Sequence, residues 1–150
     1  MKWRVAREIN SLNPLELQVR MRSGAAVIPH PDKAATGGED AYFVCEQGLW
    51  AGVADGVGGW AEMGVDAGLY ARQLMQFSQE EAMRMNLDGG PRDPLKVLSS
   101  AHRRVTVEGS TTACVLTLKD GCVRARRVVG CGVAEEHACA GRVPHTRTGG

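Results

Sequence analysis

A pair of strand-length segments joined by a tight-turn dipeptide constrains the fold of this 150-residue chain more than any other feature. Residues 111–119 are rich in β-branched and apolar side chains, and residues 122–129 form a second run of this kind. Asp120-Gly121 between them is a preferred two-residue turn of β-hairpins, because both residue types accept the positive φ angles that such turns need. The sequence therefore predicts an antiparallel hairpin at residues 111–129.

A second pair of short runs lies earlier in the chain, at residues 41–45 and 49–55. The connection between them has the length of a hairpin loop and ends in Gly48. The second run is apolar at almost every position, which is typical of a strand buried on both faces inside a layered fold.

Two helices are predicted between these hairpins. Asp66 is a suitable N-cap for a helix that continues to about Asn86, with apolar side chains at helical spacing along one face. Asp93-Pro94 has the pattern of an N-cap followed by proline at the first helical position, and this second helix is expected to end near Arg104. The order strand, strand, helix, helix, strand, strand indicates an α+β fold with antiparallel sheet packed under helices.

The composition argues against several classes of function. Hydrophobic residues make up 43% of the chain and charged residues 23%, as in soluble globular proteins. The formal net charge is +1, so no overall field favours nucleic acid as a partner. No apolar run approaches the roughly 20 residues that span a bilayer, and no membrane partner is expected.

The five cysteines are scattered, and no secretory signal precedes them, which favours reduced thiols in an intracellular compartment. Residues 1–22 are rich in arginine, as organellar transit peptides are, but contain one serine, Ser11, and two acids. A mitochondrial or chloroplast signal and a plain N-terminal lead-in of a cytoplasmic protein therefore remain alternatives for this segment.

Three short clusters, at residues 37–40, 54–60 and 109–113, are candidates for chemistry. Mg²⁺ and Mn²⁺ prefer oxygen ligands. Asp55 offers a carboxylate at the end of a buried strand, and Gly56 can turn its backbone carbonyl toward the same ion. Taken singly, each cluster is better explained by structure alone, as a polar loop end, a capped tight turn and an ordinary strand entry.

Taken together, the clusters resemble the type 2C family of metal-dependent serine/threonine protein phosphatases in order and spacing. Gly-Gly-Glu-Asp-Ala-Tyr-Phe at 37–43 and Val-Ala-Asp-Gly-Val-Gly-Gly-Trp at 53–60 are most similar to the mitochondrial and plastid branch of that family. His-Pro-Asp-Lys at 30–33 and Gly-Leu-Tyr-Ala at 68–71 also look like this branch. The resemblance covers roughly residues 23–126.

The resemblance implies an α-β-β-α sandwich of two antiparallel sheets flanked by helices, of which residues 23–129 would form the N-terminal part. It also implies hydrolysis of phosphoserine and phosphothreonine in phosphoprotein substrates by a water activated by two Mg²⁺ or Mn²⁺ ions. By resemblance, Asp55 bridges both ions and the carbonyl of Gly56 binds one of them. Glu39 and Asp40 would hold metal-bound waters and complete the catalytic group.

The chain also departs from the family pattern. Val57 stands where many members have a general-acid histidine. The arginine that commonly precedes the Glu-Asp pair is missing, and Lys33 is the nearest cation that can bind the substrate phosphate. The likeness ends near residue 130, so the later aspartates of the family have no counterpart, and residues 130–150 are expected to form an unrelated, disordered tail.

These departures leave two alternatives to an active phosphatase. The first is a truncated, catalytically dead relative that binds a partner or a phosphopeptide, or that is a splice or gene-model fragment. The second is a zinc-binding module, although no close Cys-x-x-Cys pair supports it. Its candidate ligands are Cys122, Cys131, His137 and Cys139.

Overall fold

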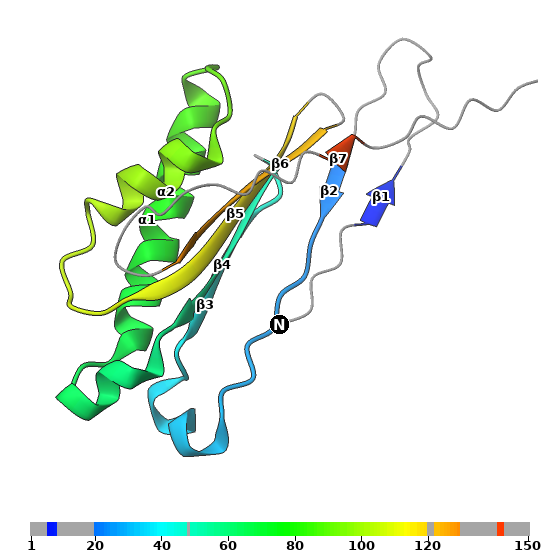
Figure 1. Cartoon of the computed structure of the whole chain (residues 1–150). Coiled ribbons are helices and arrows are strands. Elements are labelled where there is room, and N and C mark those ends of the chain that lie inside the picture. The colour runs from blue at the N-terminus through cyan, green and yellow to red at the C-terminus, as the bar shows by residue number, and fades with distance from the viewer. Residues whose placement is uncertain (1–5, 9–19, 48, 120–121, 130–140, 143–150) are drawn as a thin grey trace, which may run out of the picture.

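The main part of the fold is a five-stranded antiparallel sheet with two α-helices packed on one of its faces (Figure 1), and two further strands form a separate two-stranded sheet. The computed structural model describes residues 6–8, 20–47, 49–119, 122–129 and 141–142. The strands are β1 Ala6–Glu8, β2 Arg20–Arg22, β3 Asp40–Cys45, β4 Trp50–Gly56, β5 Thr111–Lys119, β6 Cys122–Val129 and β7 Gly141–Arg142. The helices are α1 Ala67–Leu87 and α2 Pro94–His102, with short 3₁₀ helices η1 Pro31–Thr36 and η2 Gly58–Met63.

Both predicted hairpins are present, and their central strands pair to form one sheet of order β3-β4-β5-β6-β7. In the second hairpin Lys119 pairs with Cys122, the register that a two-residue turn produces. β4 pairs antiparallel with β5 although α1 and α2 separate them in the sequence. The α+β class expected from the sequence is thus confirmed.

Both helices begin where their capping residues predict. The carboxylate of Asp66 accepts a hydrogen bond from the backbone N–H of Gly68 at 2.8 Å and caps α1. The carboxylate of Asp93 accepts one from the N–H of Leu95 at 3.0 Å and caps α2. α1 ends one residue after the predicted Asn86, and α2 ends at His102.

The core lies between the helices and the sheet. Trp50 of β4 is fully buried there, and its indole Nε1 donates a hydrogen bond to Oδ1 of Asn86 on α1 at 3.0 Å. Burial of an aromatic side chain with its N–H satisfied stabilises the packing of the helix on the sheet. The largest fully buried apolar neighbours are Met75, Val97, Leu98 and Val115.

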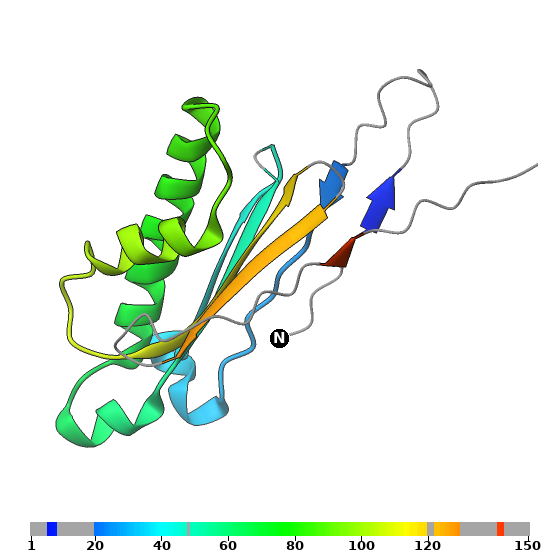
Figure 2. The same cartoon turned by 45° about the horizontal axis from the view of Figure 1, so that its top comes forward.

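The opposite side of the sheet, which we call the open face, is covered by neither α1 nor α2 (Figures 1 and 2). Met21 of β2 covers part of this face by packing against Ala51 and Leu118. Much of the rest is apolar and at least partly exposed. The side chains concerned are Tyr42, Val44, Val53, Cys114, Leu116, Val123 and Ala125.

Four segments outside the predicted helices and strands contain regular structure. η1 lies in the stretch between residues 23 and 40, and η2 follows the glycine cluster after β4. β1 and β2 pair with each other inside residues 1–22. β7 pairs with β6 inside residues 130–150, whose other residues lie outside the described part of the chain. The predicted boundaries of the lead-in and the tail stay predictions.

Candidate active site

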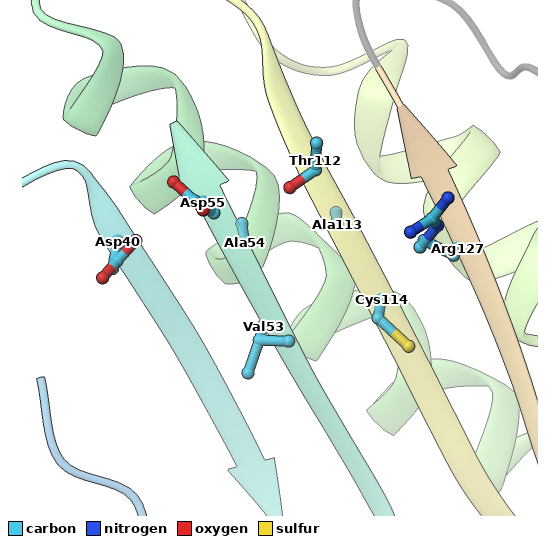
Figure 3. A pocket seen from close by; sticks show the side chains of 8 residues that line it. All are labelled: Asp40, Val53, Ala54, Asp55, Thr112, Ala113, Cys114 and Arg127. Atoms are coloured by element: carbon cyan, nitrogen blue, oxygen red, sulfur yellow. The ribbon is translucent and has the colours of Figure 1, made fainter. Parts of the chain in front are cut away.

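Two carboxylates meet where β3 begins and β4 ends. Because the strands are antiparallel, the start of β3 lies beside the end of β4, and Asp40 is the direct cross-strand partner of Asp55. Both side chains are on the open face and line a hollow of about 170 Å³ (Figure 3). The residues lining the hollow are Asp40, Val53, Ala54, Asp55, Thr112, Ala113, Cys114 and Arg127.

The two carboxylates repel each other. Partial burial raises the pKa of Asp40, and the negative charge of Asp55 beside it raises this pKa further. Among the described residues neither aspartate has a cationic side chain as an ion-pair partner. A pair of this kind attracts a cation, because a positive charge between the oxygens removes the repulsion.

Glu39 lies next to Asp40 in the sequence, but its carboxylate is directed elsewhere. Nζ of Lys33, on η1, donates a hydrogen bond to Oε2 of Glu39 at 2.5 Å. This ion pair lies against the backbone at Gly58, where a Cβ would come within 3.1 Å of both side chains. Neither Lys33 nor Glu39 is among the residues that line the hollow.

The turn after β4 is held in place by the neighbouring strands. The N–H of Gly56 donates to the carbonyl of Glu39 at 3.1 Å, and the N–H of Val57 donates to the carbonyl of Ser110 at 3.0 Å. A Cβ at Gly56 would lie 2.8 Å from the carbonyl oxygens of Glu39 and Ala67, so a larger residue cannot fit without movement of the backbone. Asp55 is therefore fixed from both sides of its strand.

α1 positions the other end of the carboxylate pair. Arg72 donates from Nη1 to the carbonyl of Gly38 at 3.1 Å and from Nη2 to Oδ2 of Asp66 at 3.0 Å. The guanidinium thereby connects the capped start of the helix to the loop that leads into β3. The position of Asp40 thus depends on α1 as well as on the sheet.

The geometry agrees with what comparisons with known proteins show. No family model matches the chain. Over 102 residues it is 52% identical to probable protein phosphatase 2C 80 of Arabidopsis thaliana, and over 127 residues it is 38% identical to probable protein phosphatase 2C 26 of the same plant. The crystal structure of the photosystem II phosphatase PBCP superposes on 67% of the chain with a TM-score of 0.61 and 40% sequence identity.

This chain belongs to the type 2C protein phosphatase family. The matches cover 68% and 83% of the chain but only 24% and 41% of the two Arabidopsis proteins, and 40% of the PBCP chain. The chain thus spans well under half the length of these relatives. The resemblance seen in the sequence is confirmed, while the activity, substrates and partners of a whole type 2C phosphatase remain to be proposed for it.

The donor chemistry of the hollow fits the hard divalent cations expected of a type 2C phosphatase. Mg²⁺ keeps several waters and is commonly held by only one or two carboxylates. Asp40 and Asp55 supply two, and partial exposure leaves room for water. Within the described part of the chain, no group of three or more acidic, histidine or cysteine side chains converges to hold a metal, so a closed site of the zinc kind is not formed there.

The structure thus places the predicted site residues of this type 2C chain in two groups. Asp40 and Asp55 share the hollow, with Gly56 directly after Asp55 in the chain, whereas Glu39 and Lys33 pair with each other beside it. None of the assigned roles is tested by this placement. Of the four proposed zinc ligands, three lie outside the described residues and only Cys122 can be placed.

Sequence reasoning missed Arg127 as a residue of the hollow, and it included Thr112 only as a member of the 109–113 cluster, without a role in the site. Thr112 is the cross-strand partner of Asp55, and Arg127 is the partner of Cys114. The Asp-Gly turn contained the signal for Arg127, because a two-residue loop fixes the pairing of every residue along β5 and β6. Placing β5 against β4 requires a contact between distant parts of the sequence, and this register has no local signal.

The described residues contain no helix long and apolar enough to cross a membrane.

Proposed function

We propose that this chain provides the aspartate pair of a metal-dependent phosphatase that removes phosphate from serine and threonine side chains of proteins. The observation that supports the proposal most directly is the cross-strand pairing of Asp40 and Asp55 in an open hollow. Membership of the type 2C family supplies the reaction class and makes phosphoproteins the expected substrates.

The positions of the residues support a role for each in this proposal. Asp55 and Asp40 would hold Mg²⁺ or Mn²⁺, with Gly56 offering its carbonyl oxygen. When bound, these ions lower the pKa of water and neutralise phosphoryl oxygens. The hydrogen bonds at Gly56 and Val57 keep Asp55 in place, and Arg72 keeps the entry to β3 in place. Pre-arranged ligands reduce the cost of ordering the site when the cation binds.

A catalytically inactive phosphatase-like protein is the second candidate. The observation that favours it is that the described residues bring only two carboxylates into the hollow. In this case the same hollow would bind a cation or a phosphorylated partner without turnover.

Replacement of Asp55 tests the proposal. We expect hydrolysis of a phosphothreonine peptide by the purified chain to require millimolar Mn²⁺ and to be lost in Asp55→Asn. Mn²⁺ affinity, measured by isothermal titration calorimetry, should fall by more than about 10-fold, because even second-layer groups at metal sites contribute about 10- to 100-fold.

Glu62→Gln is the matched control, since it makes the same chemical change on η2, at an exposed side chain outside the hollow. Mn²⁺ binding without turnover would favour the inactive candidate. Turnover that survives in Asp55→Asn, or loss of turnover in Glu62→Gln as well, would contradict the role assigned to the pair.

A further inference from the structure

The hollow is lined by one positively charged side chain, Arg127, as well as by two carboxylates. Arg127 belongs to β6, on the other side of β5 from Asp55. Arg127 of β6 is the cross-strand partner of Cys114, which lies two residues along β5 from Thr112, the partner of Asp55. Since side chains two residues apart share a face, Asp55, Thr112, Cys114 and Arg127 all belong to the open face (Figure 3).

The spacing of the strands separates the two charges. Neighbouring strands are about 4.8 Å apart, so β6 runs roughly 10 Å from β4. Among the described residues Arg127 makes no ion pair, with Asp55 or with any other acid. The hollow therefore has an acidic side, at β3 and β4, and a basic side, at β6, with room between them.

The other cations at this end of the molecule are already engaged. Lys33 is bound to Glu39, and Arg72 is bound to Asp66 and to the carbonyl of Gly38. Of the lysines and arginines that the structure describes, Arg127 alone lines the hollow. The side chain of Arg127 is exposed and can present its fork of N–H donors to an anion.

We propose that Arg127 forms the phosphate-binding side of the hollow. The proposal rests on the proposed function, because it assigns the phosphoryl oxygens of the substrate to this side and the cations to the aspartates. Arginine binds phosphate through two parallel N–H···O hydrogen bonds, which fixes the direction of the group as well as its position. Arg127 takes the role that the sequence assigned to Lys33.

The direct test measures binding of inorganic phosphate to the whole chain in the presence of Mn²⁺, by isothermal titration calorimetry. Arg127→Gln should weaken phosphate binding by about 10- to 100-fold, the range expected when hydrogen bonds to a charged group are lost. Arg127→Lys, which keeps the charge but not the fork, should lose less. Mn²⁺ affinity without phosphate should not fall, because Arg127 is not a ligand.

Arg124→Gln is the matched control. Arg124 lies on the same strand, pairs with Thr117 and is exposed, but it is three residues from Arg127 and so belongs to the other face of the sheet. Its replacement should leave phosphate binding unchanged. Circular dichroism of each variant checks that the fold is retained.

The outcomes separate this proposal from the proposed function. Phosphate binding that is weaker in Arg127→Gln but unchanged in Arg124→Gln supports the role of Arg127 in phosphate binding, even if the chain shows no turnover. Equal binding in the wild type and Arg127→Gln, an equal loss in Arg124→Gln, or no phosphate binding by the wild type at millimolar concentration overturns it. If the chain turns over a phosphothreonine peptide, Arg127→Gln should raise KM by a larger factor than it lowers kcat.

Discussion

The cross-strand aspartates Asp40 and Asp55 destabilise the folded state when no cation is bound. Like charges that lie directly opposite on neighbouring strands destabilise a sheet, and the raised pKa of Asp40 reports this repulsion together with partial burial. We expect metal-free Asp55→Asn to be more stable than the wild type at pH 7 by about 0.5 kcal/mol, the scale of exposed charge pairs. Thermal denaturation should show a Tm higher by about 1–2 °C.

The same repulsion predicts how the stability difference between Asp55→Asn and the wild type changes with pH. The pKa of Asp40 is raised in the folded state, so its destabilising contribution is absent at low pH and appears as the pH rises through that pKa. The advantage of Asp55→Asn should therefore fade on acidification, and high salt should reduce it. Glu62→Gln should show neither trend. An Asp55→Asn variant that is less stable than the wild type at pH 7 would show that the Asp55 carboxylate stabilises the fold more than its repulsion of Asp40 destabilises it.

Single residues differ in how well their positions follow from sequence. Asp55 was identified because an aspartate followed by glycines ends an apolar run, and this signal is local. The pairing of Glu39 with Lys33 was not foreseen, because it depends on the side-chain geometry of η1. Arg127 was missed for a different reason, since its place in the hollow depends on three strands being in register.

At the scale of elements, the start of α1 connects the helix to the site. Asp66 caps the helix through Gly68 and also pairs with Arg72, which donates to the carbonyl of Gly38. We expect Asp66→Ala to lower the free energy of unfolding by about 1–2 kcal/mol, because the cap and the ion pair are both lost. Denaturation by urea measures this change.

Asp66→Asn separates the two contributions. Asparagine is a good N-cap, so this variant should keep the cap and lose under about 1 kcal/mol with the ion pair. Asp93→Ala in α2 removes a cap without an ion pair and should cost about 1 kcal/mol. If Asp66→Asn and Asp66→Ala lost equal stability, the hydrogen bond to Gly68 would contribute nothing.

Elements with strong local signals were predicted well, and those without them were not. Asp66 and Asp93 fixed the helix starts, and the Asp-Gly turn fixed the second hairpin with its register. η1 and η2 are single short turns whose residues also suit a loop, so their sequences do not distinguish the two states. The pairing of β1 with β2 involves three residues on each side and has no periodic pattern long enough to detect.

For the molecule as a whole, the important feature is that α1 and α2 cover the same face of the sheet. The family resemblance implies a second sheet, and the open face is the surface on which it would pack. In this chain we expect the face to bind a hydrophobic dye such as ANS, because its side chains are apolar and partly exposed. Val44→Lys should lower the dye fluorescence at a cost of under about 0.5 kcal/mol in stability.

Met83→Lys is the control for this prediction. Met83 is half-exposed on α1, on the other side of the molecule from the open face, and its replacement should leave the fluorescence unchanged. Equal fluorescence from the wild type and Val44→Lys would indicate that the open face is covered in solution.

The position of β3 at the margin of the sheet has a mechanical consequence. In the described sheet β3 is an edge strand whose one neighbour is β4. It is therefore held in place by the hydrogen bonds to β4 and by its packing against α1. The cation proposed for Asp40 and Asp55 would link β3 to β4 at the last residue pair of this ladder. Binding of a cation in the hollow would then slow the opening of all of β3. The measurable result would be slower amide hydrogen exchange from Asp40 to Cys45.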